Sequence, residues 1–130
     1  MFLYVEDADH RPVYQQLRDQ VVEAIARGEI GEGTRLPTTR QLAVDLGLNF
    51  HTVARAYDLL RQEGYLQVGR KVGASVHVRR GPPNAEWHAE LRVLLAAAYA
   101  KGMSSEEIVT ACREATQGFG RAAEPKDSLA

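Results

Sequence analysis

The sequence is poor in the residues that metal and redox chemistry require. Cys112 is the only cysteine among 130 residues, so the chain cannot close an intramolecular disulfide and has no second thiol for a zinc site. Its four histidines, His10, His51, His77 and His88, show no H-E-x-x-H or comparable ligand spacing. A glycine-lysine loop of the kind that cradles phosphates is also missing. We therefore expect neither an enzyme nor a bound metal or other cofactor.

Long apolar runs are missing as well. No stretch approaches the length that crosses a bilayer, and Met1–Val5 is followed by Glu6, Asp7 and Asp9 instead of a cleavage site. We expect no membrane partner and a cytoplasmic location. Hydrophobic residues make up 45% of the chain, which suffices for the packed core of one ordinary domain, or of a small domain with an appendage.

A strong net charge is the third absence, because the formal charge is −1. DNA-binding domains usually carry a basic surface, which argues against a nucleic-acid partner. The charged residues are unevenly distributed along the chain, however. Residues 33–85 contain eight Arg or Lys against three acids, whereas the remainder contains eight against fourteen. One basic segment thus lies between acidic flanks, and it is either a solvated surface or a binding site for a polyanion.

Apolar residues at helical spacing predict three helices in the first half of the chain. They lie at about 12–27, 39–46 and 50–63. Thr38 or Thr39 offers a hydroxyl cap for the second helix, and Asn49 is a good N-cap for the third. Only Gly47 and Leu48 stand between the second helix and this cap. Two helices joined by so short a glycine turn indicate a helix-turn-helix.

After Gly64 the apolar period changes from helical spacing to two. Tyr65–Val68 and Ala74–Val78 are separated by a basic, glycine-flanked stretch, which predicts a short β-hairpin. Three helices followed by such a hairpin make a winged helix-turn-helix. We therefore predict a mainly α fold with a β wing, occupying residues 1–80.

The second part of the chain is predicted to be a linker and a two-helix hairpin. Two prolines make 81–85 a linker, helices follow within 86–118, and 119–130 is expected to be a flexible tail. Ser104–Glu107 has the form of a capping box that opens the last helix. The apolar faces comprise Trp87, Leu91, Leu94, Leu95, Ala98, Ile108, Val109 and Cys112. Two short helices cannot bury both stripes against each other, so we expect a homodimer; the alternative is that they fold back onto their own winged domain.

The start of the third helix is the candidate base-reading element, because the second helix of such a motif enters the major groove with its N-terminal residues. Asn49, Phe50, His51, Thr52 and Arg55 are the residues in question. His51 and Arg55 lie one turn apart and can donate to guanine or to phosphate. For His51 the alternative is an idle surface imidazole, and for Phe50 it is packing within the protein.

Contacts to the DNA backbone are predicted at the start of the second helix and at the wing. Free N–H groups of the protein backbone and the positive end of the helix dipole favour a phosphate at the start of the second helix. The candidate contacts to DNA phosphates there are Arg35, Thr38, Thr39 and Arg40. For Arg40 the alternative is an ion pair with Asp45 or a neighbouring acid. At the wing the candidate DNA contacts are Arg70, Lys71 and Gly73.

Several spaced motifs resemble one family of regulators. They are Pro12–Leu17, Gly28–Ile30, Gly33–Ala43, Thr52–Tyr57 and Glu63–Leu66. Together they resemble the DNA-binding domain of GntR-family bacterial transcription regulators over about residues 10–78. The resemblance implies a winged helix-turn-helix that binds a palindromic operator in double-stranded DNA as a homodimer. It also implies DNA contacts by Arg40, the start of the third helix and Gly73.

The chain departs from the family pattern at two places. Many members have arginine where this chain has Phe50, and the wing has Val72–Val76 in place of the usual G-x-G-T-F-V-like run. The stretch Asn49–Val53 resembles the YtrA-like subfamily, in which a short two-helix tail replaces a large effector domain. Residues 86–118 are similar to such a tail in length and pattern.

These observations favour a sequence-specific, homodimeric transcription regulator, and a repressor more than an activator. A winged-helix module that binds a protein without reading DNA is the alternative. Salt separates the two, because neutralising Z phosphates lowers affinity with a log-log slope of about −0.9Z. The sequence leaves open whether a small-molecule effector binds; its place would be the dimer interface or the junction of tail and winged domain.

Overall fold

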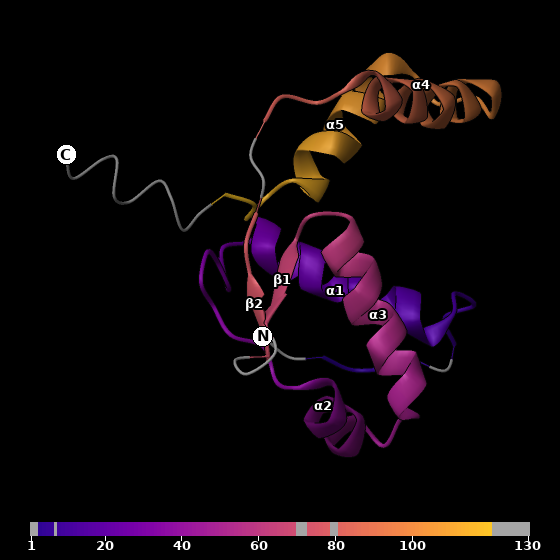
Figure 1. Ribbon diagram of the computed structural model, residues 1–130. Helices are drawn as coiled ribbons and strands as arrows, with labels where there is room; N and C mark the ends of the chain where they lie inside the picture. Colours follow the sequence, from indigo (N-terminus) through magenta and orange to yellow (C-terminus); the bar gives the residue numbers. More distant parts are fainter. Residues whose placement is uncertain (1–2, 7, 70–72, 79–80, 121–130) are drawn as a thin grey trace. The chain divides into compact units, whose positions relative to one another are not determined.

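A computed structural model describes residues 3–6, 8–69, 73–78 and 81–120. They divide into two compact units, one formed by Met1–Arg79 with Gly120–Ala130 and the other by Arg80–Phe119. Helices α1 to α3 and strands β1 and β2 belong to the first unit, and helices α4 and α5 to the second (Figure 1).

Helices α1 (Val13–Ala26) and α3 (Phe50–Gln62) form the centre of the first unit, where they pack against each other. Their facing stripes recur at the spacing of one helix face, so each helix buries one side and leaves the other to solvent. The core draws on all elements of this unit: Leu17, Val21, Ala24, Ile30, Leu36, Leu42, Ala43, Val53, Ala56, Tyr57, Leu60, Leu66, Ala74 and Val76. The three predicted helices and the hairpin are confirmed.

Helix α2 (Thr39–Leu46) leads into α3 through the turn predicted from the glycine. The Thr38 hydroxyl accepts from the Gln41 backbone N–H at 3.1 Å and caps α2. Gly47 ends α2 in the left-handed conformation with φ of 65°, and the Asn49 side chain then accepts from the His51 N–H at 2.7 Å to open α3. Capping chemistry thus fixes where each helix of the motif begins.

Gly47→Ala is expected to destabilise the protein by about 1–2 kcal/mol, because an L side chain in the left-handed region crowds its own backbone. Open space surrounds the position, so the cost is conformational and not a clash. The matched control is Gly31→Ala, where φ lies outside that region and an added Cβ also meets nothing. Urea denaturation of the two variants checks this, and equal midpoints would contradict it.

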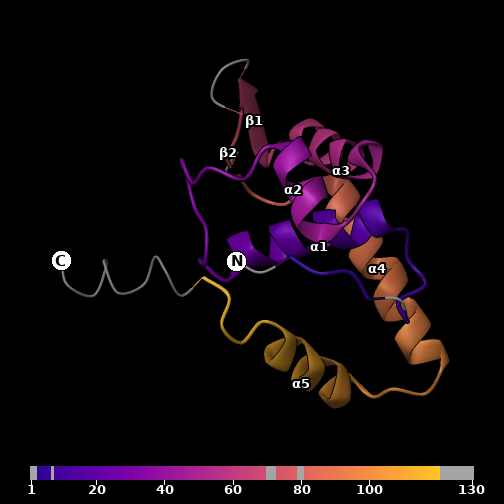
Figure 2. The same cartoon turned by 90° about the horizontal axis from the view of Figure 1, so that it is seen from below.

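Strands β1 (Leu66–Gly69) and β2 (Gly73–Val76) form an antiparallel hairpin with Leu66 opposite Val76. The hairpin lies beside α3, against which β1 packs (Figure 2). A feature that the sequence reasoning missed is the segment 33–36, which runs along the other edge of β2. The Leu36 N–H donates to the Ala74 carbonyl at 3.0 Å, and the Gly33 N–H to the Val76 carbonyl at 2.8 Å. These hydrogen bonds join the segment that precedes α2 to strand β2 of the wing.

Two glutamines of α1 hold the N-terminal segment by its backbone. Gln20 accepts from the Tyr4 N–H and donates to the Tyr4 carbonyl, at 3.0 and 2.7 Å. Buried Gln16 accepts from the Glu6 N–H at 3.1 Å and donates to the Arg11 carbonyl at 3.0 Å. Since these side chains satisfy the polar groups of residues 4 and 6, the segment adheres to α1 without a sheet partner.

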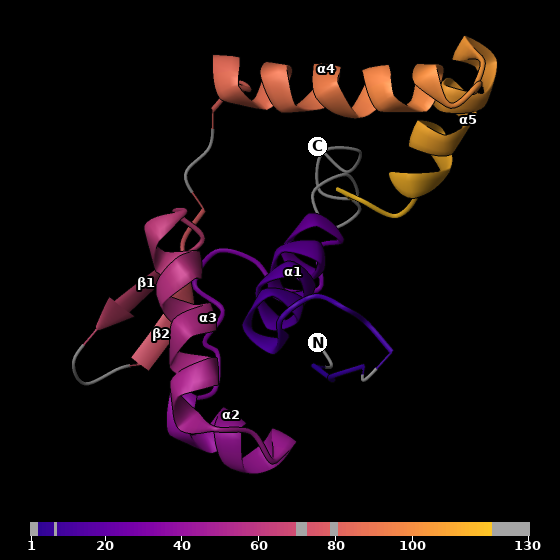
Figure 3. The ribbon, with the colours of Figure 1, turned by 90° about the vertical axis from the view of Figure 1, so that its right-hand side faces the viewer.

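The second unit consists of α4 (Ala85–Ala100) and α5 (Ser105–Ala115), joined by a short turn at Gly102. The predicted capping box is confirmed, because Ser104 and Glu107 exchange both hydrogen bonds. Neither helix contains a buried residue, and α5 leaves the end of α4 at an angle (Figure 3). Within the described residues, no helix is long and apolar enough to span a membrane.

Candidate nucleic-acid interface

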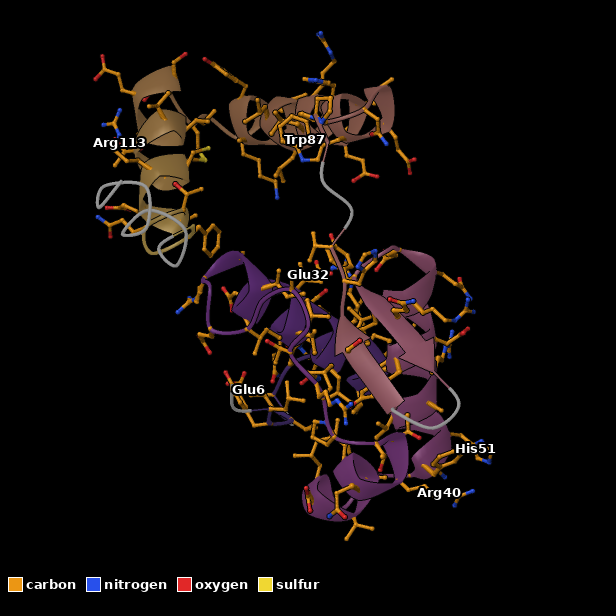
Figure 4. All side chains as sticks on the ribbon, turned by 60° about the vertical axis from the view of Figure 1, so that its left-hand side comes forward. Glu6, Glu32, Arg40, His51, Trp87 and Arg113 are labelled. Atoms are coloured by element: carbon orange, nitrogen blue, oxygen red, sulfur yellow. The ribbon has the colours of Figure 1, made fainter. Side chains whose placement is uncertain are left out.

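The N-terminal ends of α2 and α3 lie together at one end of the first unit. Arg40, in the first turn of α2, places its guanidinium carbon 4.5 Å from the ring centre of Phe50, which opens α3. The Phe50 ring also meets the His51 ring edge to face, with centroids 5.5 Å apart. Arg40 and His51 thus both contact Phe50, and Figure 4 shows them at the same end of the first unit. Two helix N-termini with a cation and an imidazole form a surface suited to an anion.

The cap residues Thr38 and Asn49 use their side chains to hold the helix starts. The oxygens of Thr38 and Asn49 accept cap hydrogen bonds, so both side chains are engaged in fixing the backbone. Among the described residues, the backbone N–H groups of Thr39, Arg40 and Phe50 have no partner. These are free donors of the kind that bind a phosphate oxygen.

Arg40 does not form the ion pair with Asp45 that sequence reasoning had left open. The Asp45 carboxylate accepts from the Gln41 side-chain amide at 2.8 Å, while Arg40 is exposed and stacks on Phe50. Phe50 itself is partly buried and packs against the core cluster. Its ring therefore takes the protein-packing alternative, with one face left for the guanidinium.

Arg55 and His51 lie one turn apart on the exposed face of α3. Arg55 places its guanidinium carbon 3.9 Å from the ring centre of Tyr14 in α1. No local sequence pattern indicates this stack, because it joins two elements that lie far apart in the chain. Thr52, the remaining candidate on this helix, is partly buried.

The wing meets the start of α2 through Gly73 and Arg35. Gly73 has φ of 72°, and a Cβ built there would lie 4.0 Å from the Thr38 methyl carbon. Arg35 is bridged to Ser75 of β2, which places it between the wing and α2. Gly73 therefore lies beside the residue that caps α2, and the backbone of Arg35 is paired with β2. Arg70 and Lys71 lie outside the described residues.

Ion pairing separates the arginines of the first unit into two groups. Four are paired with carboxylates: Arg11 with Asp9 and Asp19, Arg18 with Asp19 and Glu63, Arg27 with Glu23, and Arg61 with Asp58. In the part of the chain that the structure describes, Arg35, Arg40 and Arg55 form no ion pair. The three unpaired arginines are the three that belong to the candidate interface. The positive charge of these three side chains is therefore not neutralised by a described carboxylate.

Tyr57 joins α3 to the segment that precedes α2. Its hydroxyl donates to the Pro37 carbonyl at 2.6 Å, and burial raises the pKa of Tyr57 to about 12. The hydroxyl hence stays protonated and remains a donor at neutral pH. This bond fixes the distance between α3 and the chain leading to Thr38.

Across the described ranges, no group of three metal-ligating side chains occurs.

A family model matches most of the first unit. The model described as "Bacterial regulatory proteins, gntR family" covers residues 13–76. The HTH-type transcriptional regulator Rv1152 of Mycobacterium tuberculosis is 33% identical over 106 residues, which are 82% of this chain and 87% of that protein. The probable rhizopine catabolism regulatory protein MocR of Rhizobium meliloti is 39% identical over 88 residues, but these span only 17% of its length.

Solved structures show the same fold. YtrA from Sulfolobus acidocaldarius, a GntR-family transcription factor, is 35% identical with a TM-score of 0.54, covering 87% of this chain and 95% of that one. The structure of AraR(DBD) in complex with operator ORX1 is 25% identical with a TM-score of 0.51, covering 58% of this chain and 93% of that one. The similarity to YtrA extends beyond the winged unit, because it covers more of the chain than residues 13–76.

Proposed function

This chain belongs to the GntR family of bacterial regulatory proteins, and we propose that it is a homodimeric repressor of the YtrA-like branch that binds a palindromic operator. Transcription regulators of this family bind DNA through the winged helix-turn-helix, and an operator complex is known for the similar domain of AraR. A regulator of this kind works where the chromosome is, in the cytoplasm.

The observation that carries the proposal is the grouping of unpaired cations at the winged helix-turn-helix. Arg40 lies over Phe50 at the start of α3, Arg55 over Tyr14, and Arg35 is paired with β2, whereas the other described arginines of the unit are neutralised by carboxylates. Phosphate contacts from α2 and the wing would set the register, and His51 with Arg55 would meet base edges in the major groove. Arg70 and Lys71 extend the basic sequence of the wing.

The proposal is tested by measuring affinity against salt for two duplexes of equal length. One is a duplex that the full chain selects from a random-sequence pool, and the other is a scrambled version of it. We expect a steep loss of affinity with salt for both, and tighter binding to the selected duplex. A winged-helix module that docks on proteins would select no sequence and would show a flat salt dependence.

His51→Ala is expected to weaken binding to the selected duplex by about 1–3 kcal/mol and to relax preference at one base pair, since the imidazole would donate to a base edge. Arg40→Ala is expected to weaken both duplexes nearly alike and to reduce the salt slope by about 0.9 for each phosphate that the variant no longer neutralises. Both side chains contact Phe50, so each variant controls for the other. Unchanged base preference in His51→Ala would leave that residue an idle surface imidazole.

The proposed homodimer rests on the second unit, where apolar side chains remain exposed. Within α4, Leu94 is 67% and Val93 70% exposed, and on α5 Val109 is 52% exposed. From Leu91 to Ala100 the only charged residue is Arg92, and a helix apolar on so many sides is normally buried. We assign the dimer contact to residues 86–118. A second copy covering these helices would hold two recognition helices about 34–36 Å apart, one turn of DNA, or a multiple of it.

A further inference from the structure

Three arginines of the first unit lie over aromatic rings, and they differ in whether a carboxylate also binds them. Arg18 lies 5.7 Å from the ring centre of Tyr65 and is ion-paired as well, with Glu63 and Asp19. Arg40 over Phe50 and Arg55 over Tyr14 lie closer, at 4.5 and 3.9 Å. Within the described residues these two have the ring and no carboxylate.

An aromatic ring orients a guanidinium in a different way from a carboxylate. A carboxylate occupies the N–H donors and cancels the charge, whereas stacking uses the face of the guanidinium and leaves its donors free at the edge. An arginine held by a ring is therefore confined before it binds, yet keeps its charge and its hydrogen bonds. Confinement in the free protein lowers the entropy that is lost when the side chain contacts a ligand.

Both rings are themselves fixed by the fold. Tyr14 and Phe50 are partly buried and pack against the core cluster, while the arginines that they support are exposed. Tyr14 comes from α1, outside the two helices of the DNA-reading motif, so α1 contributes to the interface through Arg55. Phe50 lies between Arg40 on α2 and His51 on α3 and contacts both.

We propose that Tyr14 and Phe50 are positioning residues for DNA binding, which hold Arg55 and Arg40 with their donors directed at the duplex. This inference rests on the proposed function and adds how the protein prepares its cations for phosphate and base-edge oxygens. It also gives Phe50 a role that requires no contact between its ring and a base.

The test measures binding of the full chain to the selected duplex and to the scrambled duplex by fluorescence anisotropy. Tyr14→Leu and Phe50→Leu keep an apolar side chain but remove the aromatic face. Each is expected to weaken binding about two- to tenfold for every copy bound, because the arginine must then be ordered on binding instead of beforehand. The ring-retaining variants Tyr14→Phe and Phe50→Tyr are expected to recover the affinity.

Double mutants separate positioning from packing. In an Arg55→Met background, Tyr14→Leu is expected to cost no further affinity, because the side chain that it orients is gone. The same holds for Phe50→Leu in an Arg40→Met background. Tyr65→Leu is the matched control: it removes the ring under Arg18, which carboxylates also hold, so it is expected to lower the melting temperature and leave DNA affinity unchanged.

The outcomes distinguish this inference from the function on which it rests. If the wild-type chain selects no duplex, the regulator proposal and the positioning roles fall together. If it selects one but the leucine variants bind it as tightly as wild type, only the positioning roles are wrong. An equal loss in the presence and absence of the arginine would overturn them too, because it would assign the effect to packing.

Discussion

Leu94→Glu in α4 is expected to make the protein monomeric and to weaken its binding to a two-half-site operator by about 100-fold or more. Leu94 is 67% exposed in the single chain, so the substitution removes no contact on which the chain's own fold depends. In the proposed dimer the same side chain would be covered, and a carboxylate buried there without a partner is costly. Sedimentation velocity gives the oligomeric state, and anisotropy gives the affinity.

The size of this effect follows from linkage of two binding events. A dimer that occupies one half-site holds its second recognition helix at a high effective concentration near the other, and avidity of this kind raises affinity by about 10²–10⁴-fold. Separate monomers lack that gain although each keeps an intact winged unit. Binding to a single half-site should therefore change little between wild type and Leu94→Glu.

Val44→Glu is the matched control for oligomeric state. Val44 in α2 is 76% exposed, so the same charge is introduced at an equally accessible apolar position of the other unit. This variant is expected to remain a dimer. A dimeric Leu94→Glu, or a monomeric wild type that binds the operator tightly, would contradict the assignment of residues 86–118 to dimerisation.

Local signals in the sequence were sufficient for the helices of both units. Helices α2, α3 and α5 each begin at a capping side chain, because Thr38, Asn49 and Ser104 accept the cap bond, whereas α1 begins after Pro12 without a side-chain cap. A helix end depends on a residue that tolerates a positive φ, as Gly47 and Gly102 do. Because these interactions lie within a few residues of one another, the sequence contains all that is needed to predict them.

Contacts between distant segments were not predictable in the same way. The pairing of residues 33–36 with β2 is made by backbone groups, which every residue carries, so no side-chain pattern announces it. The stack of Arg55 on Tyr14 depends on how α1 crosses α3. Arg35 and Arg40 were predicted from the sequence as DNA contacts, but their lack of ion pairs was not. It follows from the structure, in which Asp45, Asp58 and Glu63 bind Gln41, Arg61 and Arg18.

Leu60→Ala in α3 is expected to destabilise the protein by about 2–5 kcal/mol, through reduced apolar burial and the cavity that remains. Leu60 is fully buried, at 0% exposure, whereas its neighbour Leu59 is only partly buried. Leu59→Ala deletes the same atoms from the same helix and serves as the control, with a smaller expected loss. Urea denaturation of the full chain gives both values.

The same helix also separates stability from recognition. Leu60 lies on the face of α3 that packs against the core, and His51 on the face left to solvent. At a temperature where the folded state still predominates, Leu60→Ala is therefore expected to keep the base preference of wild type, while His51→Ala keeps the stability and changes the preference. A change of base preference in Leu60→Ala would contradict this division, because it would mean that packing of the core sets the position of the reading face.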